Sequence, residues 1–435
     1  MASSLSQVIS FVKKIWRSEG DSAQGIAGYC LRMGRSFQLP QSADEDRLIG
    51  FKELKRALSR FGESSSGITE FGTSKRALIV ADKRSNDVAK SYIEFSCNKL
   101  LGVSFARDQM KANGVSLSSK IQFLFWGMAI GVRCLMSSKS RVNRALLIRE
   151  TVTLFAILKE LQQREISHVF NFVPYEIDSN MMSCLLMQNG IEVTLIPSSG
   201  PLGTWNKRMV ADNIVFSSPY HKEELVKFEK TILYKNILSW GPERAYEYIS
   251  KYLLESQVKN DKTIGFYSHG SWLRSFLNHT STEMDLHYAE ECALKDLSTF
   301  MKKYPAFKLT IFLHPRERKS EFLERSKQFY AEYFEGNDWE FADFSTPSSY
   351  QFDRVDIGIS TFSTIIYERL YCAKKMILGN HGIEGFPMQR STLSNISFNN
   401  FSQLESLILE ASNQSDNEFF TKHNIGDYRH PDLRK

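Results

Sequence analysis

Short apolar runs that alternate with helical patterns constrain the fold of this chain more than any other feature. In the clearest case, an apolar run over 168–173 is followed by a helical pattern over 179–189, by Gly190 and by a second apolar run over 191–196. A strand, a helix and a strand within about 30 residues form a βαβ unit, which makes the two strands parallel. The sequence therefore predicts an α/β protein built on parallel sheets.

The alternation stops at the polar segment 260–262 and then starts again, which predicts two such domains in a chain of 435 residues. We expect a helical and connecting region over 1–70, two Rossmann-like domains over 71–260 and 261–413, and a surface tail over 414–435. In the first half, strands are expected over 77–81 and 214–217, helices over 85–100, 118–137 and 142–164, and a mainly helical segment over 221–257. In the second half, strands are expected over 263–267, 308–313, 339–342, 355–359 and 376–378, and helices over 283–303, 318–334, 363–373 and 401–412.

Composition and charge exclude several classes of protein. Apolar residues make up 42% of the chain and charged residues 24%, which is typical of a globular protein and not of a disordered or collagen-like one. The formal net charge of +6 is not gathered into a basic face, so we expect no nucleic-acid partner. The six cysteines are widely spaced without a CxxC pair, which argues against a zinc site and predicts reduced thiols in the cytoplasm.

The N-terminal segment gives two interpretations. It lacks the pattern of a cleaved signal peptide, and the most apolar run, 121–136, is too short to span a membrane. Residues 5–17 have the spacing of an amphipathic helix with a basic side. Such a helix either docks on the body of the protein or makes peripheral contact with the inner face of the cell membrane.

His314, Pro315 and Arg316 follow the strand expected over 308–313. The carboxyl ends of parallel strands are where ligands bind in α/β sheets. A histidine can donate to a phosphate oxygen, and an arginine can hold a phosphate through two parallel hydrogen bonds. The alternative is a turn with solvated charges that begins a helix, because proline suits the first helical position.

Four hydroxyl groups come directly after the strand expected over 355–359 and run into the next helix. They belong to Ser360, Thr361, Ser363 and Thr364. Capping the helix needs only one of them, so the excess, together with the helix N–H groups, predicts an anion site. Glu368 follows one helical turn later, where it either reaches a ribose hydroxyl or is a surface carboxylate.

A third polar loop follows the strand expected over 263–267 and contains His269, Gly270 and Arg274. The glycine allows close approach of the backbone to a ligand, and the arginine can meet a charged group. Since the carboxyl ends of parallel strands meet at one edge of a sheet, we expect the three loops to line one crevice.

Two carboxylates, Glu176 and Asp178, follow the strand expected over 168–173, at the edge that should face the other domain. A carboxylate there can take the proton from an acceptor hydroxyl as a general base. The alternative is that Asp178 caps the helix that follows.

Other chemistries lack their sequence patterns. The chain has no GxxxxGK[ST] phosphate loop, no GxGxxG at a strand end, no GxSxG and no HExxH. Its DxD tripeptide, at 44–46, lies in a polar connecting stretch with no strand before it. We therefore expect no metal site and no cofactor.

The motifs of the second half resemble those of glycosyltransferases with the GT-B architecture, in which two Rossmann-like domains face a central cleft. The His-Pro pair at 314–315 and the Ser/Thr cluster at 360–364 are most similar to those of bacterial sialyltransferases and of Kdo-type transferases of capsule and lipopolysaccharide synthesis. In those families both motifs hold the CMP part of the donor. The resemblance therefore implies a donor-nucleotide domain over 261–413 and an acceptor domain over 71–260.

The resemblance also implies an activity, namely transfer of an acidic sugar of the sialic (nonulosonic) acid or Kdo type from CMP to a surface-glycan acceptor. Departure of CMP builds charge on a single phosphate, which hydroxyls, helix N–H groups and His314 can stabilise without a metal. Many sialyltransferases carry a pair of acidic residues followed by glycine, whose acid is the catalytic base, and this chain has no such tripeptide. Glu176 or Asp178 takes that role here, with inversion or retention left open.

Three alternatives remain at this point. The chain can be a GT-B transferase that uses a UDP- or GDP-sugar, a CDP-polyol phosphotransferase, or a non-catalytic scaffold with a degenerate site.

Overall fold

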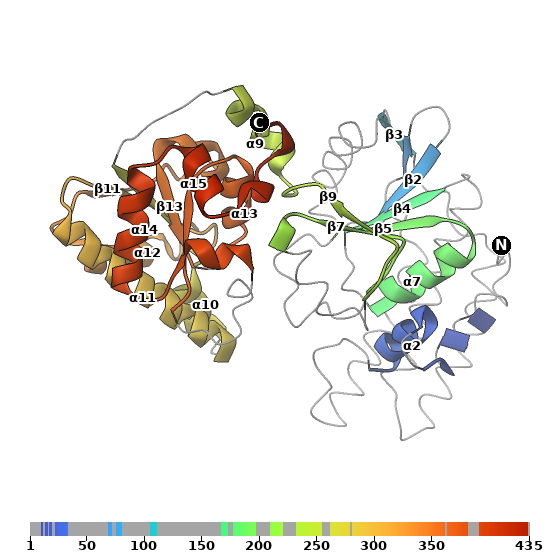
Figure 1. Cartoon of the computed structure of the whole chain (residues 1–435). Helices are drawn as coiled ribbons and strands as arrows, with labels where there is room; N and C mark the ends of the chain where they lie inside the picture. Colours follow the sequence, from blue (N-terminus) through green and yellow to red (C-terminus); the bar gives the residue numbers. More distant parts are fainter. Residues whose placement is uncertain are drawn as a thin grey trace, which may run out of the picture. The chain divides into compact units, whose positions relative to one another are not determined.

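The computed structural model (Figure 1) shows a chain that divides into two compact units. The residues that the structure describes are 10, 11, 14, 15, 17–19, 22–33, 68–71, 75–80, 105–110, 167–172, 177–196, 209–220, 232–254, 262–278, 281–361, 363–381 and 391–433. The N-terminal unit comprises Met1–Ser198, Leu202–Phe216 and Leu225–Glu243, and the C-terminal unit comprises Ser199–Pro201, Ser217–Glu224 and Arg244–Lys435. The helices expected over 118–137 and 142–164 lie outside the described residues, as does the one over 85–100.

The sheet of the N-terminal unit has the strand order β3-β1-β2-β4-β5-β7-β9. Its strands are β1 (Ile68–Phe71), β2 (Lys75–Val80), β3 (Phe105–Met110), β4 (His168–Asn171), β5 (Glu192–Leu195), β7 (Asn213–Phe216) and β9 (Asn236–Ser239). The five strands from β2 to β9 pair in parallel, whereas β1 pairs antiparallel with both β2 and β3. The parallel sheet predicted from the sequence is therefore confirmed, with an antiparallel edge that the sequence analysis did not predict.

The βαβ unit that set the fold class is present as β4, α7 (Ile177–Gln188) and β5. Gly190 ends the helix in the left-handed conformation, with φ of 74°, which glycine adopts at little cost. The described part of β4 and β5 is buried apart from the first residue of each strand. This burial explains why both strands are continuous apolar runs in the sequence.

The expectation of a mainly helical segment over 221–257 was wrong for its middle part. Residues 232–239 form β8 (Ile232–Leu233), which pairs with β6 (Met209–Val210), and β9, which lies at the edge of the main sheet. Only α9 (Ala245–Leu254) is helical among the described residues that follow. An edge strand has one open side, so its residues are half-exposed and carry a weak apolar signal.

Helix α9 belongs to the C-terminal unit, although the polar segment 260–262 suggested a boundary after it. Its Tyr252 hydroxyl donates to the Ser349 carbonyl at 2.6 Å and accepts from the Phe352 N–H at 3.1 Å. Tyr248 and Tyr252 also pack against the Phe352 ring. These contacts with η2 (Ser348–Arg354) fix α9 on the second unit.

The sheet of the C-terminal unit has the order β12-β11-β10-β13-β14-β15, and all its strands are parallel. They are β10 (Thr263–Tyr267), β11 (Lys308–Phe312), β12 (Trp339–Phe341), β13 (Ile357–Ser360), β14 (Met376–Gly379) and β15 (Ser397–Phe398). This is the strand order of a Rossmann fold, in which the first strand lies beside the fourth. The order therefore reverses between β10 and β13, and ligands of such sheets bind at the carboxyl ends of the strands at this point.

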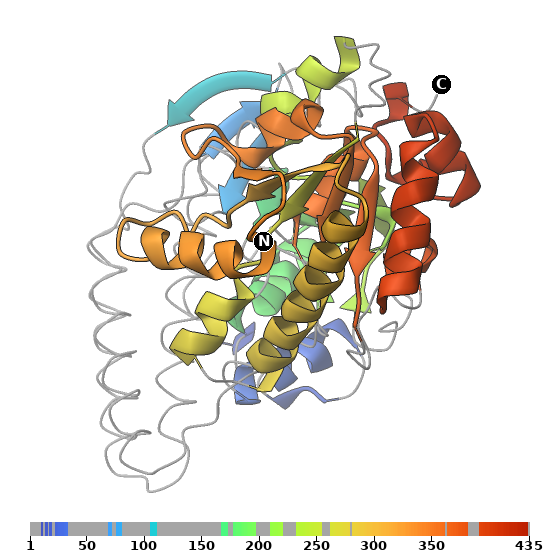
Figure 2. The same cartoon turned by 90° about the vertical axis from the view of Figure 1, so that its left-hand side faces the viewer.

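Helices cover both faces of this sheet. The long helix α11 (Ser281–Lys303) lies between α12 (Leu323–Phe334) and α14 (Phe401–Ser412), as Figure 2 shows, and it contacts both of them. Helix α10 (Ser271–Asn278) contacts α11, and α13 (Ile365–Tyr371) contacts η2 and β14. The carboxyl edge of the sheet is thus left to the loops that follow the strands.

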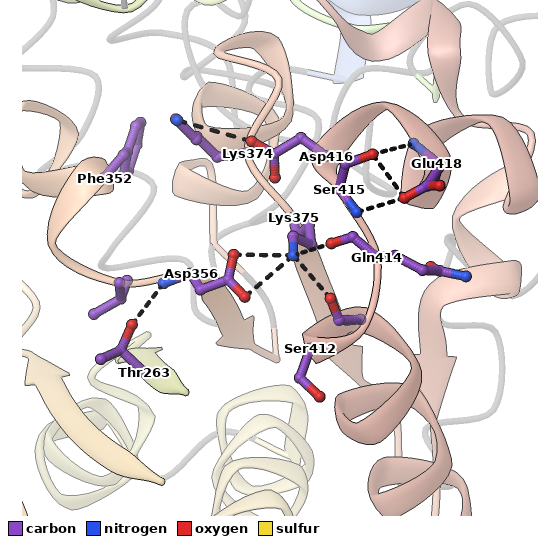
Figure 3. A network of polar contacts seen from close by, with 12 residues as sticks. Thr263, Phe352, Asp356, Lys374, Lys375, Ser412, Gln414, Ser415, Asp416 and Glu418 are labelled. Atoms are coloured by element: carbon purple, nitrogen blue, oxygen red, sulfur yellow. Dashed lines mark hydrogen bonds and ion pairs between the residues drawn. The ribbon is translucent and has the colours of Figure 1, made fainter. Parts of the chain in front are cut away.

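The opposite, amino edge is fixed by two buried cations. The Lys375 ammonium group is bonded to the Asp356 carboxylate and to the carbonyls of Ala411 and Gln414 (Figure 3). The Arg369 guanidinium, which has no exposed surface, donates to the Tyr267 hydroxyl and to four backbone carbonyls. The carbonyls are those of Phe352, Val355, Asp356 and Lys375. Both cations are used by the fold itself.

The structure differs from the expected surface tail over 414–435. Residues Asp416–Lys422 form helix α15, which begins with a capping box between Ser415 and Glu418. Phe419 and Phe420 are fully buried. Two 3₁₀ turns follow, η5 (Gly426–Tyr428) and η6 (Pro431–Leu433). The segment is thus part of the C-terminal unit.

Ala373, directly after the C-cap of α13, has φ of 56°, a left-handed conformation that costs an alanine about 1–2 kcal/mol. Part of this cost is offset because glycine makes the unfolded chain more flexible. Ala373→Gly is therefore expected to raise the free energy of unfolding by about 0.5–1 kcal/mol, measured by urea unfolding of the full chain. A decrease in stability would contradict this interpretation of the backbone.

Of the expected helix over 5–17, the described residues 10, 11, 14, 15 and 17 are helical. Ile15 is fully buried, whereas Lys14 and Arg17 are exposed, as expected of a helix docked on the protein. Among the helices that the structure describes, none combines the length and the apolar character needed to cross a bilayer.

Candidate functional site

Two loops come together at the carboxyl edge of the C-terminal sheet. One follows β10 and contains His269, and the other follows β11 and contains His314. The two strands pair in parallel, which brings the two histidine rings within 6.4 Å of each other, centroid to centroid. His269 is 6% exposed, and His314 is partly exposed. The sequence-predicted residues His269, Gly270, Arg274, His314 and Arg316 all belong to this cluster, which we call the two-loop site.

Gly270 allows the two loops to pack closely against each other. Its φ is 67°, and a Cβ atom added there would lie 3.2 Å from Cβ of His314. From the sequence, this glycine was expected to allow the close approach of a ligand. The structure gives it a different partner, since the His314 side chain occupies the space.

Gly270→Ala is therefore expected to destabilise the chain by about 1–3 kcal/mol, because it adds both a left-handed alanine and a close contact. Urea unfolding measures this cost. The matched control is Gly336→Ala, at φ of 79° with no atom near the added Cβ, which carries the backbone cost alone. Equal losses for the two variants would show that His314 does not restrict position 270.

Glu290 of α11 holds the first loop from beneath. Its carboxylate accepts hydrogen bonds from the N–H of His269 at 2.7 Å and of Ser271 at 3.0 Å, and from the hydroxyls of Ser268 and Ser271. It is fully buried. The N-terminus of α10 therefore already has an anion, supplied by the protein itself.

Glu317 holds the second loop in the same manner. It accepts from the His314 N–H at 2.7 Å and from the indole N–H of Trp272 at 2.6 Å, and its Oε1 lies 3.0 Å from the Tyr330 hydroxyl. Burial, and then the charge of Glu290, raise the pKa of Glu317 to about 7. Glu290 and Glu317 were both missed as site residues. The available signal was a glutamate between Ala289 and Ala293 on the apolar side of a long helix.

The exposed side of the two-loop site is a set of hydrogen-bond donors. The Arg316 N–H donates to Nδ1 of His314 at 3.2 Å, so Nδ1 is the acceptor nitrogen of that ring. Burial, and then the charge of Arg274, lower the pKa of His314 to about 4, so the ring is neutral at pH 7 and carries its hydrogen on Nε2. Nη2 of Arg274 lies 3.4 Å from this Nε2. The guanidinium and the imidazole thus lie side by side, and both can donate hydrogen bonds to the oxygens of an anion.

His269 is also neutral at pH 7. Burial, followed by the charge of Arg274, lowers its pKa to about 3. Arg316 is exposed, and its charge also lowers the pKa of both histidines. The guanidinium groups of Arg274 and Arg316 therefore act on both histidines, and the charge of Arg318 adds to the lowering of the His314 pKa.

Arg318 has a structural role. Its guanidinium donates to the carbonyls of Leu313 and Phe344 and to the Ser348 hydroxyl. These bonds connect the end of β11 to the loop after β12. Pro315, between His314 and Arg316, is exposed.

The four hydroxyls after β13 separate into two pairs. Ser360 and Thr361 are buried, and the Ser360 hydroxyl donates to the Tyr267 carbonyl at the end of β10, at 2.8 Å. The Thr361 methyl group lies against Gly379 of β14. Ser363 is half-buried and Thr364 is exposed, and Thr364 makes no side-chain cap of α13. Only the second pair is therefore placed to meet a ligand.

Glu368 is partly exposed on α13. It lies close enough to Tyr248 of α9 for its charge to add to the effect of burial, which raises the Tyr248 pKa well above its ordinary value. Glu368 therefore has a neighbour on α9. The contact with a ribose hydroxyl that the sequence predicted stays a prediction.

The two candidate bases of the N-terminal unit lie at the start of α7 or before it in the sequence. Glu176 lies outside the described residues, and Asp178 is in the first turn of α7. In the part of the chain that the structure describes, no three His, Cys, Asp or Glu side chains gather in a way that could hold a metal ion.

No protein-family model matches the sequence, and no curated protein matches it either. Similar solved structures include a UDP-N-acetylglucosamine 2-epimerase from Rickettsia bellii, with 10% identity, a TM-score of 0.42 and coverage of 81% of this chain and 91% of that one. MurG from Acinetobacter baumannii has 13% identity, a TM-score of 0.38 and coverage of 66% and 76%. A UDP-GlcNAc 2-epimerase from Neisseria meningitidis, bound to UDP-GlcNAc, has 12% identity, a TM-score of 0.35 and coverage of 72% and 85%. Likenesses at this level establish neither a family nor an activity for the chain.

Proposed function

We propose that the two-loop site binds the phosphate of a nucleotide-activated sugar, and that the chain is a glycosyltransferase. The observation that carries this proposal is that Nη2 of Arg274 and Nε2 of His314 lie 3.4 Å apart, so that both side chains can donate to the oxygens of one anion. They lie at the carboxyl edge of two adjacent parallel strands, next to the point where the strand order reverses. This is the position at which Rossmann sheets bind nucleotides.

The donor that we propose is a CMP-linked acidic sugar, of the sialic acid or Kdo type, and the acceptor is a surface glycan. Arg274 and Arg316 supply two positive charges, which suit the single phosphate of CMP as it departs. A neutral His314 adds a hydrogen bond through Nε2 and no further charge. Ser363, Thr364 and Glu368 are the remaining candidates for contacts with the nucleotide.

Transfer breaks the bond between the sugar and the phosphate oxygen of CMP and joins the sugar to an acceptor hydroxyl, which loses a proton. Guanidinium groups and the His314 N–H stabilise the charge that remains on CMP. Glu176 or Asp178 is proposed to take the proton, as a general base. Neither a metal nor a cofactor is part of this proposal. Measuring binding with and without EDTA tests whether a metal ion is needed.

Thermal unfolding of the full chain with CMP, CDP, UDP, GDP and CDP-glycerol, each with and without EDTA, tests the donor class. A ligand at about 100 times its dissociation constant adds about 2.7 kcal/mol to stability, which raises the Tm by several degrees. We expect stabilisation by CMP that EDTA does not remove. A preference for UDP or GDP would point to other sugar nucleotides, and a preference for CDP-glycerol to a polyol phosphotransferase. No shift with any nucleotide would contradict the proposed function and favour a scaffold.

A further inference from the structure

A buried chain of hydrogen bonds connects the two glutamates beneath the two-loop site. The Tyr330 hydroxyl, from α12, lies 3.0 Å from Oε1 of Glu317 and 2.6 Å from Oγ of Ser268. Ser268 in turn lies 3.3 Å from Oε1 of Glu290. All four residues are buried, with Glu290, Glu317 and Tyr330 fully so.

This chain has three links but only two hydroxyl protons. Tyr330 and Ser268 supply one proton each, and each link needs one. If both glutamates are ionised, one contact joins two acceptors without a proton between them. A buried contact of that kind is costly, so one glutamate must supply the third proton.

The other hydrogen bonds show which glutamate holds it. Glu290 accepts from three further donors, which are the N–H groups of His269 and Ser271 and the Ser271 hydroxyl. Glu317 accepts from two, the His314 N–H and the Trp272 indole. The carboxylate with more donors is the better stabilised anion, so the proton belongs to Glu317.

We infer that Glu290 and Glu317 are positioning residues of the two-loop site, that Glu317 carries a proton which it donates to Tyr330, and that binding of an anion at Arg274 and His314 favours this protonated state. This inference rests on the proposed function for its ligand. The chain then runs in one direction, from Glu317 through Tyr330 and Ser268 to Glu290. Breaking this chain of hydrogen bonds is expected to move the backbone N–H groups of His269 and His314, which the two glutamates hold.

The charged neighbours of Glu317 agree with this assignment. Burial, and then repulsion by the charge of Glu290 on α11, raise the pKa of Glu317 to about 7. Arg318 on the same turn acts in the opposite direction, and the Tyr330 hydroxyl faces Glu317 from α12. On the side of α10, Trp272 faces Glu317 through its indole N–H, and the charge of Arg325 from α12 lies over the Trp272 ring. An anion bound at Arg274 and His314 adds one more negative charge nearby and so favours uptake of a proton.

Infrared difference spectroscopy of the full chain between about pH 5.5 and 8.5 detects the proton directly, because a protonated carboxyl has a C=O stretch that the carboxylate lacks. We expect a band that is lost in Glu317→Gln and kept in Glu321→Gln, an exposed glutamate four residues further on. Should Glu317→Gln not fold, Tyr330→Phe takes its place. There we expect the band to shift, because the proton has lost its acceptor. A spectrum unchanged in these variants would overturn the inference.

Calorimetry of CMP binding near pH 7.5, in two buffers of different ionisation heat, tests the coupling to the ligand. Uptake by the histidines beside the anion is common to the wild type and to Glu317→Gln, so the difference between the two reports on Glu317. We expect the wild type to take up more of a proton per CMP bound than Glu317→Gln, whereas equal uptake by both would contradict the coupling. Absence of CMP binding to the wild type would count against the proposed function. The infrared band would still show whether Glu317 carries the proton.

Discussion

Replacing Arg274 by alanine is expected to weaken CMP binding about 100-fold while the fold stays intact. The side chain is partly exposed on α10, and alanine is a good helix former, so the helix tolerates the change. What is lost is a charge-assisted hydrogen bond to the phosphate and the partner of His314, worth about 2.7 kcal/mol when converted to affinity. Isothermal calorimetry with CMP measures the change.

The matched control is Arg325→Ala. Arg325 is an exposed guanidinium that lies over the Trp272 ring, with 5.6 Å between Cζ and the ring centroid. It is therefore near the two-loop site but is not one of the two proposed donors, Arg274 and His314. We expect the loss of Arg325 to change CMP affinity by less than about threefold, because solvent and salt screen an exposed charge. Equal losses for the two variants would show that CMP responds to the general positive charge and not to Arg274.

Arg369→Leu is expected to lower the free energy of unfolding by at least about 4 kcal/mol, the largest loss of stability that we predict. The fully buried guanidinium donates to the Tyr267 hydroxyl and to four backbone carbonyls, and leucine leaves these acceptors without their donor. A Cβ atom on Gly358 would lie 2.6 Å from Nε of Arg369, so β13 leaves space for this side chain. Urea unfolding, with hydrogen exchange in β10 and β13, reports the loss.

Arg354→Leu provides the comparison for this prediction. Arg354 lies on η2, is exposed and pairs with Glu340 at 2.9 Å. Ion pairs at the surface contribute at most about 1 kcal/mol. A loss below about 1 kcal/mol for Arg354→Leu beside a large loss for Arg369→Leu is therefore expected. Similar small losses for both would mean that the buried guanidinium is replaceable by an apolar side chain.

The sequence predicted the parallel strands of the C-terminal unit because fully buried strands are written as continuous apolar runs. Residues 376–378 are of this kind, residues 263–267 and 308–312 are buried apart from the first residue of each, and all three segments are strands. The strands β9 and β1 were not predicted. β9 lies at the edge of the sheet and is half-exposed, and β1 is a short strand with the mixed pattern Ile68-Thr-Glu-Phe71. The C-terminal segment was read as a tail because Phe419 and Phe420 stand alone among polar residues.

The candidate site shows a different limit of the sequence. Position at a strand end correctly selected the loops after β10 and β11, which the parallel register then brings together. It could not tell which side chains turn inward, so Ser360 and Thr361 were grouped with Ser363 and Thr364 although they are buried. Glu290 is distant in sequence from both loops, and only the position of α11 against them reveals its part in holding His269.

The measurement that tests the central claim most directly is a crystal structure of the full chain grown with CMP. We predict that a phosphate oxygen lies within about 2.7–3.2 Å of both Nη2 of Arg274 and Nε2 of His314, at the carboxyl ends of β10 and β11. CMP bound elsewhere on the chain, with Arg274 and His314 free of it, would contradict the account.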